Sequence, residues 1–215
     1  MFIITIAVLY GHALSCAGAT DAIGTGSCTE DTPGENAING YDFLKEGTRI
    51  DLIMTSLSDV FKHPDGGTVS CITVLTTEKN AETHEVTMVV SYKLGNDWEE
   101  FGHTYEFKQP QSGAHYVTMN NTQLNGAPSG TYTFTYVMGN CAVVTVEKFG
   151  ARMNESNPEE RTDESTNSKP HCIMWEKKGT SHATQKCCEK FFTANCEAKN
   201  RDYSYSPNTC GSPPH

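Results

Sequence analysis

Short runs in which apolar and polar residues alternate follow one another from residue 50 to residue 149. Alternation with a period of two is typical of strands that bury one face. Gly, Pro, Asn or Asp bounds each run, as expected of turns. With a further run near the C-terminus, the pattern predicts about eight strands. They are Ile50–Leu57, Thr68–Thr77, Glu82–Leu94, Trp98–Lys108, Ala114–Met119, Gly130–Met138, Cys141–Phe149 and Cys172–Lys178.

Helical patterns occur only at the two ends of this series. Apolar residues at every third position predict a short helix within Ala37–Glu46, which Gly47 ends. Cys and Phe at i, i+4 spacing predict a longer helix over His182–Ala198. Consecutive antiparallel strands joined by short turns close most simply into an up-and-down barrel whose interior can hold one small ligand. A β-sandwich is the alternative architecture.

Two segments do not fit the strand pattern. Residues 2–10 are apolar but too short to span a bilayer, and Ala17-Gly18-Ala19 follows as a cleavage signature. This predicts a signal peptide at residues 1–19 and one secreted domain at residues 20–215. Gly150–Pro170 has no hydrophobic periodicity and is rich in acidic residues, so we expect a surface loop that proteases cut.

Charge and motifs narrow the class of function. The net charge of −10 and a pI of about 5.2 disfavour nucleic acid and anionic membranes as partners. No stretch outside the signal peptide is apolar enough to span a membrane. The nucleophile, zinc-protease, dinucleotide and phosphate-loop motifs are missing, and the histidines are scattered one to an element. We therefore expect a monomeric binding protein, not an enzyme, with no cofactor and no metal.

The cysteines predict disulfides. Of the nine, Cys16 lies in the signal peptide, and an even number in a secreted chain implies bridges. Cys187 and Cys188 are adjacent in the predicted helix, so they diverge by about 100° and can take different partners. If that helix runs antiparallel to the last strand, Cys196 returns to the level of Cys172. Residues 171–210 would then be cross-linked to the rest of the chain through the upstream cysteines Cys28, Cys71 and Cys141.

Two glycosylation sequons occur outside the strand patterns. They begin at Asn120, in the sequence Asn-Asn-Thr, and at Asn154, in the sequence Asn-Glu-Ser. Both fall in predicted loops, where a glycan has room.

Several motifs together resemble a known family. They are GYDFLKEGT in the first helix, the run GTYTFTYVMGNCAVVTVEKF, the strand CIMW, a helix bearing two adjacent cysteines and a cysteine near the C-terminus. This combination is similar to the tick salivary lipocalins, the histamine-binding-protein and moubatin-like group, over most of the mature chain. The resemblance implies an all-β fold, an eight-stranded antiparallel lipocalin (calycin) barrel with a short N-terminal helix and a C-terminal α-helix packed on it.

The resemblance also implies a function and a disulfide pattern. Family members are injected into the host, where they sequester histamine, serotonin, leukotrienes, thromboxane, fatty acids or cholesterol, and some bind complement proteins. Such a protein would counter host inflammation and immunity. The implied pairs are Cys28–Cys187, Cys71–Cys210 and Cys141–Cys188. They leave Cys172–Cys196, the pair that the strand–helix geometry suggests.

The amine-binding members carry Cys-Asp-aliphatic on one strand and Glu-Leu-Trp on the next. Here these positions read Cys141-Ala142-Val143 and Ile173-Met174-Trp175, so both acids are replaced by apolar residues. A buried ammonium without a carboxylate costs several kcal/mol, so an apolar lipid or sterol is the favoured ligand. The alternatives are a histamine or serotonin held by another carboxylate, and a host protein bound through the loops. The other candidate carboxylates are Glu85, Asp97 and Glu100.

The expected ligand contacts are aromatic and aliphatic positions of the strand runs. Tyr132, Phe134 and Tyr136 alternate with threonines and so share one face of their strand. The complete set is Trp98, Phe107, Tyr132, Phe134, Tyr136, Ala142, Val144, Ile173 and Trp175.

Overall fold

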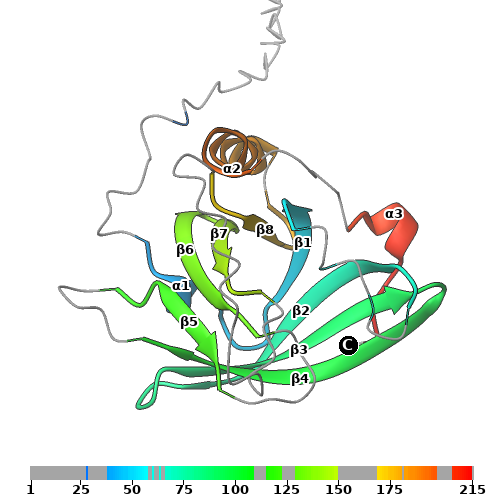
Figure 1. The fold of residues 1–215 in the computed structure, drawn as a ribbon, viewed down its shortest axis with the longest axis horizontal. Coiled ribbons are helices and arrows are strands. Elements are labelled where there is room, and N and C mark those ends of the chain that lie inside the picture. The colour runs from blue at the N-terminus through cyan, green and yellow to red at the C-terminus, as the bar shows by residue number, and fades with distance from the viewer. Residues whose placement is uncertain are drawn as a thin grey trace, which may run out of the picture.

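The computed structural model describes residues 28, 38–57, 60, 63, 66–108, 115–122, 129–149, 169–180, 182–197 and 205–214. Within them, antiparallel strands β1 to β8 form a closed barrel in chain order (Figure 1). Pairing between β1 and β8 closes the sheet. The strands are β1 (Arg49–Thr55), β2 (Val69–Asn80), β3 (Glu85–Leu94), β4 (Asp97–Phe107), β5 (Thr118–Asn121), β6 (Thr131–Met138), β7 (Cys141–Glu147) and β8 (Cys172–Lys177).

Three helices accompany the strands in the described part of the chain. They are α1 (Gly40–Phe43), α2 (His182–Asn195) and α3 (Pro207–Cys210). The long helix α2 lies on the outside of the barrel against β6, β7 and β8 (Figure 1). The predicted architecture, a closed antiparallel barrel with a C-terminal helix packed on it, is therefore confirmed.

Three differences from the predicted elements are larger than a shift of a few residues at an end or change the setting of a named residue. Helix α1 is a single turn: Asn39 caps it by accepting a hydrogen bond from the Asp42 backbone N–H at 3.1 Å, and the backbone leaves the helical region at Leu44. Helix α3 carries no hydrophobic periodicity that sequence reasoning could detect. Strand β5 begins and ends later than expected, so Asn120 lies in a half-buried strand position and not in a loop.

Some expectations fall on residues that the structure does not describe. The signal peptide at residues 1–19, Asn154 and residues 150–168 of the expected loop lie outside the described residues.

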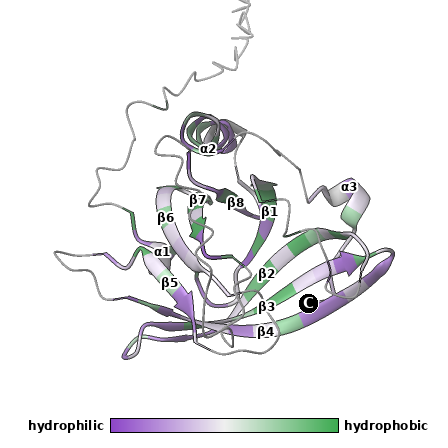
Figure 2. Cartoon of the chain, in the orientation of Figure 1, coloured by the Kyte–Doolittle hydropathy of each residue, from purple (hydrophilic) through white to green (hydrophobic). Residues whose placement is uncertain are grey.

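The barrel sheet has apolar residues on both faces of some strands. Bands of hydrophobic and hydrophilic residues follow one another along β2, β3 and β4 (Figure 2). On β6, β7 and β8, the inner face joins the core of the barrel, while the outer face packs under α2. We call this second group the outer cluster. Its buried members are Met54, Tyr136, Cys141, Val143, Cys172, Met174, Cys188, Phe192 and Cys196.

Two β-bulges determine which face of the sheet the residues after them occupy. In β6, Phe134 lies opposite Val144, but Tyr136 lies opposite Val143, so β6 has one extra residue. Because such a residue shifts the alternation, Phe134 points into the barrel and Tyr136 points out under α2. A similar shift between Leu52 and Met54 of β1 places Met54 in the outer cluster.

Four disulfides hold the C-terminal part of the chain, three of them joining it to barrel strands and one to Cys28, which precedes α1. They are Cys28–Cys187, Cys71–Cys210, Cys141–Cys188 and Cys172–Cys196, the pairs that the resemblance and the strand–helix geometry gave. Cys187 and Cys188 thus take different partners, as their divergence on α2 requires.

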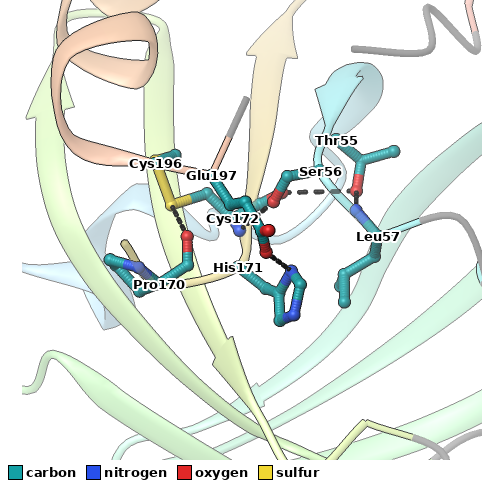
Figure 3. A network of polar contacts seen from close by, with 8 residues as sticks. All are labelled: Thr55, Ser56, Leu57, Pro170, His171, Cys172, Cys196 and Glu197. Atoms are coloured by element: carbon teal, nitrogen blue, oxygen red, sulfur yellow. Dashed lines mark hydrogen bonds and ion pairs between the residues drawn. A yellow bond between two sulfur atoms is a disulfide. The ribbon is translucent and has the colours of Figure 1, made fainter. Parts of the chain in front are cut away.

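Polar contacts surround the Cys172–Cys196 bridge (Figure 3). The Cys172 backbone N–H donates to the Ser56 hydroxyl at 2.8 Å, which joins the start of β8 to the end of β1. His171 Nδ1 lies 3.2 Å from Glu197 Oε2, across the same bridge. The end of α2 is therefore fixed to the barrel by a covalent bond and by polar contacts.

Candidate functional site

The barrel encloses a cavity of about 270 Å³. Strand residues form most of its wall, and residues of the connections form one end. That loop end is lined by Leu57, Val60, His63 and Phe149. The full lining is Leu44, Ile50, Leu52, Leu57, Val60, His63, Val69, Ile72, Val74, Met88, Val90, Tyr92, Phe101, Tyr105, Met119, Tyr132, Phe134, Phe149, Ile173 and Trp175.

Helix α1 covers part of the cavity away from the loop end. Leu44, which follows α1, is 2% exposed and lines the cavity. The rings of Phe43 and Phe134 have centroids 5.8 Å apart, so α1 packs directly on β6. A Cβ at Gly40 would lie 2.3 Å from the Phe134 ring, so only glycine allows this approach.

Four of the expected contact residues line the cavity. Tyr132 and Phe134 face it from β6, and Ile173 and Trp175 face it from β8. Three others, Phe107, Ala142 and Val144, belong to the same inner core but are not part of the cavity lining.

The structure places Tyr136 and Trp98 outside the cavity, which corrects both expectations. The bulge in β6 turns Tyr136 outward, where its ring stacks on Phe191 of α2 with centroids 4.6 Å apart. Trp98 lies opposite Lys93 on the outer side of the β3–β4 hairpin, with Lys93 Nζ 5.5 Å from its ring centroid.

Sequence reasoning missed the wall formed by β3 and β4. Met88, Val90 and Tyr92 line the cavity from β3, and Phe101 and Tyr105 line it from β4. Both strands show alternation in the sequence. Nothing in that alternation, however, says which face of the strand turns inward.

Among the residues that the structure describes, the cavity lining includes no carboxylate and no Lys or Arg. Ala142 and Ile173, the positions compared with the two acids of the amine-binding pattern, are 0% and 5% exposed in the inner core. The carboxylates expected as substitutes do not line the cavity. Glu100 is exposed, and it accepts a hydrogen bond from Ser91 at 2.6 Å.

Glu85 and Asp97 likewise do not line the cavity. A carboxylate that sequence reasoning did not select lies at its edge instead. Glu99 is exposed, and it accepts a hydrogen bond at 3.2 Å from the hydroxyl of Tyr92, a lining residue.

Buried hydroxyls interrupt the apolar wall between β4 and β6. The Tyr105 and Tyr132 rings are perpendicular, with centroids 5.5 Å apart, and their hydroxyls share a hydrogen bond. Burial raises the pKa of Tyr132 to about 12, and it raises the pKa of Tyr105 well above 10. Both hydroxyls therefore stay protonated at physiological pH.

Among the described residues, no group of three or more His, Cys, Asp and Glu side chains could hold a metal ion. The same residues include no helix long and apolar enough to cross a membrane.

Eight antiparallel strands in chain order, closed around a cavity and followed by a packed helix, decide the fold. The chain has the lipocalin fold. No protein-family model matches this lipocalin-fold sequence, and no curated protein matches it significantly. Among solved structures it is similar to japanin from Rhipicephalus appendiculatus, in a crystal structure with bound cholesterol.

The likeness to japanin has a TM-score of 0.47 at 10% sequence identity, and it covers 76% of this chain and 96% of japanin.

Proposed function

We propose that this protein is a secreted lipocalin that sequesters a small apolar host mediator, a lipid or a sterol, inside its barrel. The observation that carries the proposal is the cavity inside the barrel, whose lining, over the part of the chain that the structure describes, holds aliphatic and aromatic side chains and no carboxylate. Apolar surface gains roughly 25 cal/mol for each Å² removed from water. An ammonium in the same place loses its hydration without gaining a counter-charge.

The size of the cavity bounds the ligand. An apolar cavity of about 150 Å³ holds one benzene molecule. The cavity of about 270 Å³ is therefore suited to a ligand of roughly twice that size. A sterol or a long fatty acid would extend through the loop end, past Val60 and His63.

Native mass spectrometry of the protein secreted by eukaryotic cells, followed by organic extraction, tests whether an apolar ligand is bound. Isothermal titration then compares a fatty acid and cholesterol with histamine and serotonin. We expect sub-micromolar affinity for an apolar ligand and tens of micromolar or weaker for an amine, a difference of about 2.8 kcal/mol. Nanomolar histamine binding together with no apolar binding would refute the proposal.

A gain-of-function variant sharpens this test. Restoring the acids at both replaced positions, with Ala142→Asp and Ile173→Glu, puts two carboxylates into the inner core. We expect the double variant to bind histamine more tightly and the apolar ligand more weakly. A double variant with Ala142→Asn and Ile173→Gln, which has similar shape but no charge, controls for the change in volume.

One observation favours an amine as the second candidate. Tyr92 lines the cavity and donates to Glu99, so a carboxylate lies one side chain away from the loop end. An amine could pair with Glu99 there while its ring entered the cavity. If titration detects amine binding, Glu99→Gln should abolish it and Glu100→Gln, on the neighbouring position, should not.

A further inference from the structure

Four polar side chains meet on one wall of this otherwise apolar interior. We call them the polar patch: His103 and Tyr105 of β4, Asn121 of β5 and Tyr132 of β6. All four are nine-tenths or more buried. Two of them, Tyr105 and Tyr132, line the cavity directly, and the other two flank Tyr105.

His103 is 1% exposed, and neither ring nitrogen has a hydrogen-bond partner within the described part of the chain. Its ring contacts the Tyr105 ring edge to face, with centroids 4.6 Å apart. Burial lowers the pKa of His103 below its ordinary value of 6.5, so the ring is neutral at pH 7. It therefore offers one N–H donor and one bare nitrogen.

Asn121 lies directly across from Tyr105 in the β4–β5 pair. Its Oδ1 accepts a hydrogen bond from the Gly130 backbone N–H at 3.1 Å, but its Nδ2 is buried without a partner among the described residues. A Cβ at Gly130 would lie 3.2 Å from the Tyr132 hydroxyl oxygen. The Asn121 amide and the Tyr132 hydroxyl thus both lie beside Gly130.

The tyrosine hydroxyls leave a further donor. They share one hydrogen bond, so whichever oxygen donates, one hydroxyl hydrogen of the pair is left over. With Asn121 Nδ2 and one His103 nitrogen, the polar patch presents mainly N–H and O–H donors. A buried donor without a partner is costly, and an acceptor oxygen placed here would remove that cost.

We infer that the polar patch receives an uncharged oxygen of the ligand, a hydroxyl or a carbonyl, so that the ligand lies with its polar end inside the barrel and its apolar end toward the loops. This inference rests on the proposed function. We infer an uncharged oxygen because the described part of the cavity lining offers no Lys or Arg to pair with a carboxylate. The ligand class is therefore a monohydroxylated or keto apolar molecule.

The test uses ligands that share one chain and differ at its end: 1-decanol, 1-chlorodecane and decanoate. Their affinities are measured by displacement of a fluorescent apolar probe from the full-length protein and from single variants. Tyr132→Phe and Asn121→Leu should each lower the affinity for decanol relative to chlorodecane about fivefold. Tyr92→Phe removes a hydroxyl at the loop end instead, and it should leave that ratio unchanged.

A second measurement can be made first on the wild-type protein alone. The carbonyl stretch of bound 2-decanone should lie at lower frequency in the wild-type protein than in hexane, because the carbonyl accepts a hydrogen bond. In Tyr132→Phe the stretch should move toward its value in hexane.

The outcomes separate the inference from the proposed function. If no decyl ligand binds, the proposed function fails. If all bind but the ratio changes only in Tyr92→Phe, or the ketone stretch matches hexane, the ligand function stands and the inward orientation is wrong. If decanoate binds more tightly than decanol, the ligand oxygen is charged and the inference is overturned.

Discussion

The barrel wall carries two apolar regions of opposite character. Toward the inside, its side chains surround a cavity of about 270 Å³. Toward the outside, the same strands β6, β7 and β8 form the outer cluster, where Phe192 and Tyr136 fill the space under α2 and two disulfides cross it. One region leaves room for a ligand, while the other is filled by the chain itself.

This difference shows that apolar periodicity indicates that a strand face is buried, but not whether that face lines a cavity or packs against another element. Val143 and Val144 are neighbours in β7 and both are 0% exposed, yet they belong to opposite regions. The division depends on which face α2 covers and on the bulges that set the facing of each residue. The outer cluster should therefore determine stability, and the cavity wall should determine binding.

The largest effect on stability should come from Phe192→Ala. Phe192 is 1% exposed in the outer cluster, so the change creates a void that costs about 3–5 kcal/mol. Trp175→Ala removes an even larger side chain from the half-buried cavity wall, where it enlarges existing space, and should cost less. Urea unfolding of both variants measures the difference. Equal losses would show that the two regions do not differ in packing.

Removal of the Cys172–Cys196 bridge should have the next largest effect. This disulfide spans 24 residues, and a closed loop of that length contributes about 3–4 kcal/mol by restricting the unfolded chain. The double variant Cys172→Ala and Cys196→Ala should unfold at lower urea concentration while its ligand affinity stays unchanged. A matching loss of affinity would mean that the outer cluster also holds the cavity in shape.

Acidification should lower the stability of the folded protein through His103, on the cavity side of the barrel wall. Its pKa is lowered by burial in the folded protein, so protons bind more tightly to the unfolded chain. The part of the free energy of unfolding that depends on a neutral His103 is fully present above pH 6.5. It is lost as the pH falls below 6.5 toward the folded-state pKa, by at most about 1.4 kcal/mol per pH unit. Unfolding of the wild type and of His103→Phe between pH 7.5 and pH 5 measures this. Identical pH profiles would contradict it.

The comparison also explains what the sequence could predict. Alternation and turn residues are local properties, and they sufficed to predict the strands in chain order, while they favoured the closed barrel over a β-sandwich. The facing of Tyr136 was wrong because a single extra residue in β6, invisible in the alternation, turns it outward. Glu99 was overlooked in favour of its neighbour Glu100 for a different reason. Adjacent strand residues point to opposite faces, and alternation alone does not say which face turns inward.

The polar patch could not be found from the sequence either. His103, Asn121 and Tyr132 come from three strands, and only the pairing of β4 with β5 and of β5 with β6 brings them together. In the sequence, His103 and Tyr132 lie in separate predicted strands, and Asn121 falls in a predicted loop. The disulfides were reached through resemblance, because spacing alone leaves 105 pairings of eight cysteines.

The smallest effect should come from the polar part of the outer face. Asp51 of β1 lies directly opposite Glu176 of β8, and burial, more than their mutual repulsion, raises the pKa of Glu176 above 4.5. Like charges directly opposite each other destabilise a strand pair, so Glu176→Gln should stabilise the protein by about 0.2–1 kcal/mol at pH 7. Because the folded-state pKa is raised, the penalty is present above that pKa and disappears below pH 4.5.

Thermal unfolding of Glu176→Gln at pH 7 and at pH 4 measures this gain, with Asp51→Asn as the reciprocal variant. Either change relieves the same repulsion, so the double variant should gain little more than either single variant. Glu176 also hydrogen-bonds with Thr180, which a glutamine can retain. A variant that is less stable at pH 7 would show that this hydrogen bond matters more than the repulsion, and that the outer face is stabilised by its polar residues as well as by its packed core.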